Sequence, residues 1–495
     1  MERKSGILLH ISSLPSPYGI GTLGREAHSF VDFLAAAGQR CWQLLPLGPT
    51  GLFDSPYQSF STYAGNPYFV DLDLLRAEGL LERSDYEGLD FGRDPRRVDY
   101  GKLYAQRIPV LRRAYARFRM REGWRGELDA LFARERWLSD YALFMALKAH
   151  FGGVEWPAWP DAEIRMRRPG AMARYRALLD EEIGFHAFVQ GRFFAQWETL
   201  RAHVRARDIQ LIGDLPIYVP LDSADVWAAP ALFQLDGAQR PTAVAGVPPD
   251  SFSADGQLWG NPLYDWAAME RDGFSWWIDR VRAAGRLYDL VRIDHFRGLA
   301  SYWRVPATEK TAVRGAWVRG PGMKLIGALQ RALPGLRFIA EDLGYLTEDV
   351  TALREEAGLP GMKVIQFAFD SREASDYRPH SYERNSVCYT GTHDNTTAAG
   401  WFSEASPEDV RKAVAYLGLN AEEGYANGLI RGGMSSVAAL FIAQIQDYLG
   451  EDGRFRMNTP GTVGGGNWCY RVAPGALDGA LAARILAMTK LYGRA

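Results

Sequence analysis

The chain has 495 residues, of which 47% are hydrophobic and 23% are charged, and its formal net charge is -2. These proportions are typical of a soluble globular protein with a large core, and the near-balance of charges argues against a nucleic-acid-binding protein. The three cysteines, Cys41, Cys388 and Cys469, are odd in number and widely spaced, so we expect neither a disulfide framework nor a zinc site.

The N-terminal segment and the hydropathy of the chain bear on its location. The first apolar stretch is only a few residues long and is interrupted by Pro15 and Pro17, so we expect no signal peptide. No segment approaches the roughly eighteen consecutive apolar residues that a membrane span needs. The expectation is therefore a cytoplasmic protein without a membrane partner.

Short apolar strands alternate with helical segments along the chain. The predicted strands, in chain order, are residues 7–10, 42–45, 209–212, 287–294, 336–341, 362–367, 387–390 and 455–458. The predicted helices between the later strands are residues 186–207, 274–284, 322–333 and 347–357. This alternation predicts the α/β class with a parallel sheet. Because several strands end in acidic or polar residues, a closed (β/α)8 TIM barrel, whose strand ends meet at one mouth, fits better than an open sheet.

Two stretches are too long to be simple crossovers between barrel strands. The first contains the helical segments 100–118 and 135–151, and the second is rich in proline, glycine and tryptophan, which is typical of a functional loop. The predicted organisation is the start of the barrel over 1–49, a helical insertion subdomain over 50–185, barrel over 186–217, a lid-bearing insertion over 218–273, and the remainder of the barrel over 274–495.

The residues best suited to chemistry are four acids at predicted strand ends: Asp214, Asp294, Glu341 and Asp394. Residues i and i+2 of a strand share a face, so Arg292 should lie beside Asp294, lower its pKa and keep it ionised. Glu341, near anionic Asp294 and Asp394 and shielded from water, should keep its proton. One charged and one protonated carboxyl group is the arrangement used in retaining glycoside chemistry.

Structural alternatives stand beside these functional interpretations. Taken singly, an acid of this kind is more often a helix cap or a surface partner. His393 is either a buried histidine that holds a loop or a donor to a ligand hydroxyl. The stretch 245–264 is either a lid over an extended ligand or a surface loop. The motifs HExxH, GxSxG, the P-loop and GxGxxG after a strand are absent from the sequence, which disfavours zinc proteases, serine hydrolases, nucleotide-phosphate enzymes and dinucleotide oxidoreductases.

Taken together, these motifs resemble the 4-alpha-glucanotransferases of the amylomaltase (disproportionating enzyme) type, glycoside hydrolase family seventy-seven. The resemblance runs from His10 to Trp468, and its most specific parts are residues 54–59, 213–219, 248–262, 292–298, 340–344 and 391–395. It implies transfer of α-1,4-glucan segments to the 4-hydroxyl of another glucan or of glucose, by a retaining double displacement and with no cofactor and no metal.

The resemblance also implies roles for individual residues. Asp294 would be the nucleophile, Glu341 the general acid and then the base, and Asp394 the group that grips hydroxyls of the distorted sugar. The substrate-binding residues that it implies are Ser55, Tyr57, Asp214, Gln257, Trp259, Arg292, His393, Asn395 and Asn467. Of these, Tyr57, Asp214, Arg292 and His393 would line the same subsite as the three acids.

Three positions depart from the usual family pattern: Ser251 in the lid, Tyr470 near the end, and Leu52-Phe53 before the Ser-Pro-Tyr motif. They bear on chain-length preference and on a secondary glucan site, not on the reaction. Two other functions stay open from the sequence: an α-glucan hydrolase of the α-amylase type and a non-catalytic glycan-binding protein on a decayed barrel. The three acids together disfavour the latter. We expect a monomer.

Overall fold

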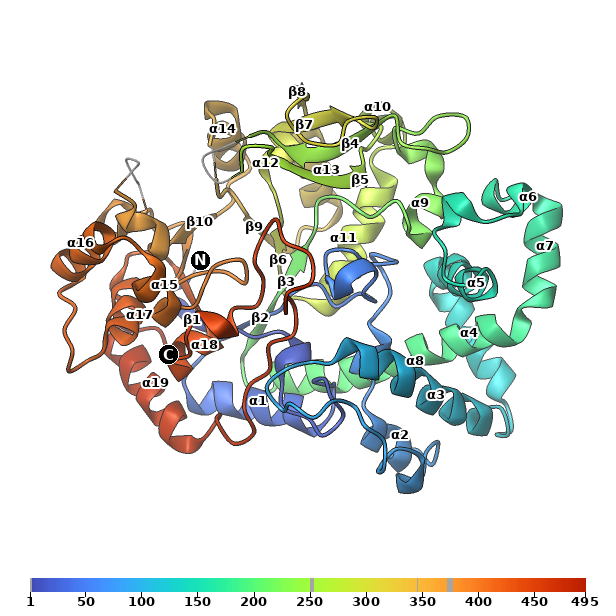
Figure 1. Cartoon of the computed structure of the whole chain (residues 1–495), viewed down its shortest axis with the longest axis horizontal. Helices are drawn as coiled ribbons and strands as arrows, with labels where there is room; N and C mark the ends of the chain where they lie inside the picture. Colours follow the sequence, from blue (N-terminus) through green and yellow to red (C-terminus); the bar gives the residue numbers. More distant parts are fainter. Residues whose placement is uncertain (1, 250–252, 345, 372–376) are drawn as a thin grey trace.

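The computed structural model describes residues 2–249, 253–344, 346–371 and 377–495, and its centre is a parallel sheet of eight strands (Figure 1). The sheet order is β10-β11-β12-β1-β2-β3-β6-β9, and the backbone N–H of Ala340, in β9, donates to the carbonyl of Pro360, next to β10, at 2.9 Å. The sheet is therefore nearly closed, and the predicted TIM barrel is confirmed. Its strands are β1 (Lys4–Leu8), β2 (Cys41–Gln43), β3 (Gln210–Leu215), β6 (Leu290–Ile293), β9 (Arg337–Ala340), β10 (Gly361–Val364), β11 (Ser386–Tyr389) and β12 (Leu440–Gln444).

Mostly apolar residues from the barrel strands fill the interior of the barrel. Ile212, Ile339 and Ile442 belong to a buried cluster to which all eight strands contribute and which is separate from the larger core outside the barrel. A Cβ atom at Gly6 would lie 2.5 Å from Cys41 of the neighbouring strand, so β1 and β2 approach closely there because position 6 is glycine. The acids at the mouth rest on this packed core.

The prediction for the last strand is wrong. Residues 455–458 do not form a strand, because the carboxylate of Asp452 accepts the N–H of Arg454 and starts a 3-10 turn over Gly453–Phe455. The chain then continues without regular secondary structure to Asn458, which contacts Asp394. The eighth strand is β12, whose residues Leu440, Phe441, Ile442 and Ala443 are all buried.

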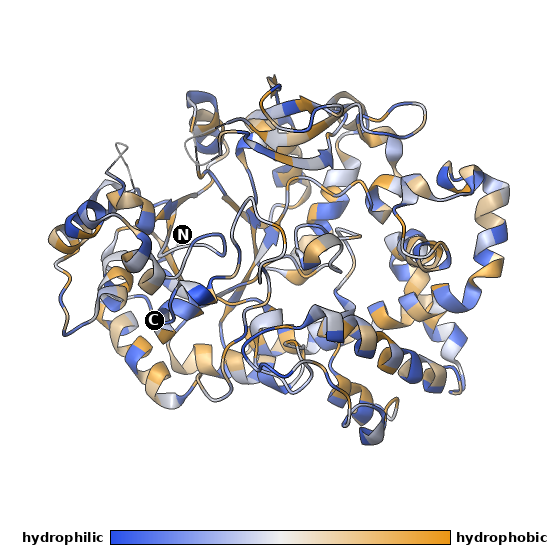
Figure 2. Cartoon of the chain, in the orientation of Figure 1, coloured by the Kyte–Doolittle hydropathy of each residue, from blue (hydrophilic) through white to orange (hydrophobic). Residues whose placement is uncertain are grey.

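The predicted helices are present, with shifts at their ends. The barrel helices α8 (Asp180–Arg205), α11 (Ser275–Leu287), α13 (Met323–Ala332) and α14 (Glu348–Glu356) lie between the strands as predicted. Figure 2 shows hydrophobic and hydrophilic residues interleaved along the helices, as expected for helices with one face on the core. Apart from the helical group described below, the remaining α-helices are α1 (Arg25–Ala36), α2 (Leu72–Ala77), α9 (Ala224–Ala228), α10 (Trp266–Arg271), α12 (Arg297–Ala300), α15 (Ala398–Glu404), α16 (Pro407–Leu417), α17 (Tyr425–Ser435), α18 (Ile445–Leu449) and α19 (Gly479–Leu491).

Two groups of elements stand outside the barrel (Figure 1). A helical group contains α3 (Tyr100–Phe118), α4 (Trp124–Arg134), α5 (Arg136–His150), α6 (Ala162–Arg165) and α7 (Pro169–Leu178). An antiparallel sheet with the order β5-β4-β7-β8 contains β4 (Ala243–Val247), β5 (Gln257–Pro262), β7 (Ser301–Pro306) and β8 (Ala316–Arg319). This sheet joins the stretch 218–273 to residues beyond it; the domain boundaries stay a prediction. Within the described residues, none of the helices has the length and apolarity to cross a bilayer.

Candidate active site

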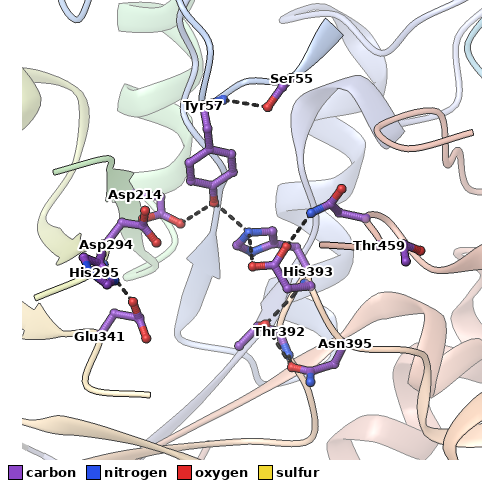
Figure 3. A network of polar contacts seen from close by, with 12 residues as sticks. Ser55, Tyr57, Asp214, Asp294, His295, Glu341, Thr392, His393, Asn395 and Thr459 are labelled. Carbon is purple, nitrogen blue, oxygen red and sulfur yellow. Dashed lines mark hydrogen bonds and ion pairs between the residues drawn. The ribbon is translucent and has the colours of Figure 1, made fainter. Parts of the chain in front are cut away.

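The ends of the barrel strands place acidic side chains at one mouth. Asp214 lies one residue before the end of β3, and Asp294 and Glu341 directly follow β6 and β9. Asp394 lies in the loop after β11. Since the strands are parallel, these positions share the carboxyl-terminal face of the barrel, where TIM-barrel enzymes hold their active sites. Figure 3 shows Asp214, Asp294 and Glu341 on one side of the site and His393 opposite them.

A single guanidinium group connects two of the acids. Nη1 of Arg292 lies 2.7 and 2.6 Å from the two carboxylate oxygens of Asp214 and 3.0 Å from Oδ1 of Asp294. The side chain of Asp214 is fully buried, whereas that of Asp294 is 26% exposed. Asp214 therefore holds the arginine in place, and Asp294 is the most exposed of these three side chains.

The pKa of Asp294 differs from the prediction. Burial raises the pKa of Asp294 more than Arg292 lowers it, and the neighbouring Asp214 and Asp394 raise it further, to about 7. The prediction that Arg292 keeps this pKa low is wrong, because burial outweighs the effect of the arginine, whose charge is also shared with the buried carboxylate of Asp214. Asp294 is thus a carboxylate that titrates close to neutral pH.

Glu341 is held by two backbone donors. Its Oε2 accepts the N–H of His295 at 2.7 Å, and its Oε1 accepts the N–H of Leu343 at 2.9 Å. Burial raises the pKa of Glu341, Arg292 lowers it and Asp294 raises it, with a net value of about 8. The predicted raised pKa is confirmed. Because the arginine contacts Asp294 directly, the single proton that the two acids share at neutral pH belongs on Glu341.

The backbone at His295 aligns the two acids. Its φ angle is +49°, in the left-handed region that non-glycine residues seldom adopt, and such strain is typical of functional sites. This turn directs the N–H of the residue after Asp294 to the carboxylate of Glu341. Burial lowers the pKa of His295 to about 3, so its ring is neutral, and the ring packs edge-on against Trp259 at 4.8 Å. We predicted no role for His295, although it adjoins Asp294 in the chain.

A chain of hydrogen bonds crosses the site through Tyr57 (Figure 3). The hydroxyl of Tyr57 donates to Oδ2 of Asp214 at 2.8 Å and lies 2.8 Å from Nε2 of His393, whose ring stacks on the tyrosine at 5.2 Å. Since the tyrosine proton goes to the carboxylate, Nε2 of His393 carries a proton and donates. Burial lowers the pKa of His393 while Asp394 raises it, and the net shift is downward, so the ring is neutral.

Asp394 has two neighbours that its strand-end position did not predict. Nδ2 of Asn458 donates to its Oδ1 at 2.6 Å, and Nη2 of Arg456 donates to its backbone oxygen at 2.7 Å. Its Oδ2 lies 3.4 Å from Nε2 of His393, and its side chain is 42% exposed. We did not predict Asn458 and Arg456 as site residues, because we expected them to belong to a barrel strand. The sequence signal that could have indicated them is the polar pair Arg456 and Asn458 on either side of the apolar Met457.

The other predicted binding residues lie around this centre, and several contact their own segment. Oγ of Ser55 accepts the N–H of Tyr57 at 3.3 Å, and Oε1 of Gln257 accepts Nε1 of Trp259 at 3.2 Å. The amide oxygen of Asn395 accepts two bonds from Thr392, and that of Asn467 accepts the N–H of Thr459. Ser251 lies outside the described residues.

No group of three or more His, Cys, Asp and Glu residues among those that the structure describes is arranged to hold a metal ion. The chemistry available at the mouth from the side chains described above is acid, base and nucleophilic chemistry of carboxyl groups. Neutral donors and one arginine surround these groups.

Comparison with known proteins gives matches over the full length of the chain. A family model described as 4-alpha-glucanotransferase matches residues 9–477. The 4-alpha-glucanotransferase of Clostridium butyricum is 46% identical over 98% of this chain and 100% of its own, and that of Thermus thermophilus is 49% identical over 100% and 99%. The solved structure of amylomaltase from Streptococcus agalactiae in complex with acarbose superposes with a TM-score of 0.97, at 42% identity and 100% coverage of both chains.

Proposed function

The chain belongs to the 4-alpha-glucanotransferase family, glycoside hydrolase family 77, and catalyses transfer between α-glucans; on this premise we propose that it works by double displacement through a covalent glucosyl ester of Asp294. The observation that carries the proposal is the pair of Asp294 and Glu341. Asp294 is bound to arginine, Glu341 has the higher of the two raised pKa values, and the backbone of His295 joins them. Retention through such a pair needs a separation of about 5 Å between the carboxyl groups.

In the first step, an oxygen of Asp294 attacks the anomeric carbon of the donor glucan. The bond to the 4-oxygen of the next glucose breaks, and Glu341 gives that oxygen its proton. In the second step, the 4-hydroxyl of an acceptor glucan attacks the same carbon, its proton passes to Glu341, and Asp294 leaves as a carboxylate. The anomeric configuration is inverted twice and is therefore retained.

The remaining residues bind and orient the sugar in this proposal. Asp394 accepts hydrogen bonds from hydroxyls of the distorted ring, and Tyr57, Asp214, Arg292 and His393 line the same subsite. Trp259, Gln257 and Ser55 contact neighbouring sugars, with Asn395 and Asn467 at the rim. The position of Trp259 against His295 supports a cover over the site, and a cover that excludes water favours a sugar acceptor over hydrolysis.

Maltotriose as sole substrate tests transfer against hydrolysis of the α-amylase type. We expect glucose and maltodextrins longer than maltotriose, with a constant concentration of reducing ends, because the anomeric carbon released from the donor becomes bonded to the 4-hydroxyl of the acceptor, so that no reducing end is formed or lost. Chromatography of the oligosaccharides, combined with a reducing-end assay, measures both quantities. A steady rise in reducing ends, without longer products, would identify a hydrolase.

We expect kcat/KM to follow a narrow bell-shaped dependence on pH. The rate falls as the pH drops through about 7, because Asp294 becomes protonated and loses its nucleophilicity. The rate also falls as the pH rises through about 8, because Glu341 loses the proton that the leaving oxygen needs. Initial rates across this range check the prediction, and a profile that is flat on both sides contradicts the assigned roles.

We further propose that the substrates are maltooligosaccharides and amylose, derived from starch or glycogen, and that the enzyme acts as a cytoplasmic monomer without nucleic acid, membrane or cofactor. The buried, free thiols of Cys41 and Cys388 support a reducing compartment, and the near-zero net charge supports the absence of a polyanionic partner.

A further inference from the structure

The segment 456–458, which has no regular secondary structure, holds Asp394 and its neighbour His393 through a set of hydrogen bonds. Arg456 donates from Nη2 to the backbone oxygen of Asp394 and from Nε to the backbone oxygen of Asn458, at 2.7 and 2.9 Å. The N–H of Asn458 donates to the backbone oxygen of His393 at 3.0 Å, and its Nδ2 donates to Oδ1 of Asp394 at 2.6 Å. Hydrogen bonds to Asp394 and His393 therefore join the loop after β11 to the segment after α18.

The contact between the carboxamide and Oδ1 is the one that bears on the reaction. The side chain of Asp394 is 42% exposed, so it could rotate unless a neighbour held it, whereas Asn458 is a buried residue and is itself fixed by its backbone bonds. The donor is neutral, so it orients the carboxylate and leaves its negative charge uncompensated by a cation from that side. Arg456 binds the backbone of Asp394 and does not replace this donor.

We propose that Asn458 is a positioning residue that fixes the orientation of Asp394 toward the sugar, and that it connects this orientation to the glycine-rich segment 459–467 that follows it. The connection is direct in the chain, because Thr459 follows Asn458 and its N–H donates to the side chain of Asn467 at the other end of that segment. Gly461, Gly464 and Gly465 within the segment have positive φ angles. The inference rests on the proposed role of Asp394.

Substitution of Asn458 by aspartate gives a test that separates orientation from simple support. The shape is unchanged, but two carboxylates then face each other at hydrogen-bond distance and cannot both be ionised. With one shared proton, an O–H···O bond replaces the original N–H···O bond and the pair carries one negative charge, as in the parent enzyme. Without that proton, the two groups repel and Asp394 turns away.

The expected result is therefore a loss that depends on pH. At pH 8.5 we expect kcat of Asn458→Asp to fall about 100-fold, the cost of misplacing a catalytic group by about 1 Å. The ratio of the variant's kcat to that of the parent enzyme should rise at least about tenfold between pH 8.5 and pH 5.5. Asn458→Ala should lose activity by a factor that does not change with pH, since it has no donor at any pH. The other charged or titratable groups around Asp394 are His393, Arg456, Tyr57 and Asp294. All four are present in the parent enzyme and in both Asn458 variants, so their titration cancels in the ratio of kcat values.

Two controls complete the experiment. Asn420→Asp makes the same chemical change at an exposed position whose side chain accepts the N–H of Glu423, and it should leave kcat unchanged. Melting temperatures monitor folding, and the exchanged pair Asp394→Asn with Asn458→Asp should restore the melting temperature but not kcat, because the charge then stands at the wrong position.

The outcomes distinguish this inference from the proposal on which it rests. A ratio for Asn458→Asp that is constant with pH, or a kcat equal to that of the parent enzyme at pH 8.5, overturns the positioning role. That result leaves the function intact if Asp394→Asn alone loses activity. Full activity of Asp394→Asn would instead refute the role of Asp394, and the inference with it.

Discussion

Asp294→Asn is expected to abolish glucan transfer, lowering kcat by at least about 10⁴-fold. The carboxamide has the size of the carboxylate and can still accept from Nη1 of Arg292, so the fold of the mouth should survive. However, it is a poor nucleophile and cannot form the glucosyl ester. Such a loss corresponds to roughly 5 kcal/mol of transition-state stabilisation, which exceeds what any single hydrogen bond at this site supplies.

A matched control is available on the surface. Asp279→Asn makes the same substitution in a side chain that is 63% exposed and pairs with Arg282 at the i+3 position. Exposed ion pairs contribute less than about 1 kcal/mol, so its activity should equal that of the parent enzyme. Initial rates on maltotriose, with the melting temperature of each protein, give the comparison. If Asp294→Asn retained full transfer activity, another residue would have to be the nucleophile.

The second large effect concerns Glu341→Gln, and its size should depend on the donor. The glutamine cannot protonate the leaving 4-oxygen, so kcat on maltotriose should fall about 10³-fold or more, at the upper end of what general acid catalysis contributes. A glycosyl fluoride donor needs no such proton, because fluoride is a good leaving group. Formation of the maltosyl ester of Asp294 from α-maltosyl fluoride should therefore be much less impaired.

This variant also has a characteristic pH dependence. The alkaline side of the profile for ester formation should disappear, since the group whose loss of proton defines it is gone, while the acidic side set by Asp294 remains. Single-turnover measurements of fluoride release across the pH range provide the data. Equal losses on maltotriose and on the fluoride would mean that Glu341 acts as a structural residue and not as the acid.

Much of the barrel could be predicted because local patterns determine it. Seven of the strands are short apolar runs, several of which end in polar residues, and this pattern needs no knowledge of distant contacts. The eighth was misplaced, since residues 455–458 have a similar alternation but are preceded by Asp452, which caps a turn. The small antiparallel sheet was not predicted either, because β4 pairs with β7, more than forty residues further along the chain.

The site could be predicted in its composition but not in its electrostatics. The strand ends identify Asp214, Asp294 and Glu341, and the i, i+2 spacing places Arg292 beside Asp294. Spacing does not reveal that Asp214 is fully buried and takes two contacts from the same nitrogen. That packing and the burial of Asp294 itself are tertiary properties, and together they raise the pKa of Asp294.

The same dependence on tertiary packing explains why the hydrogen bond from Asn458 to Asp394 could not be predicted from the sequence. Asn458 lies 64 positions further along the chain, in a segment without secondary structure that only the assembled mouth brings beside the loop after β11. Asn395 and Asn467 are predicted as binding residues only by the resemblance to the family. Their side chains contact their own loops, so their roles toward a sugar depend on how those loops meet the substrate.

Trapping of the ester tests the central claim most directly. Glu341→Gln mixed with α-maltosyl fluoride and quenched in acid should show a protein whose mass is increased by one maltosyl group, because the ester forms without an acid and lacks the base needed for its discharge. Peptide mass mapping should then assign the added sugar to the side chain of residue 294. A maltosyl group on any other residue, or fluoride release with a β-configured product and no labelled protein, would contradict the double displacement.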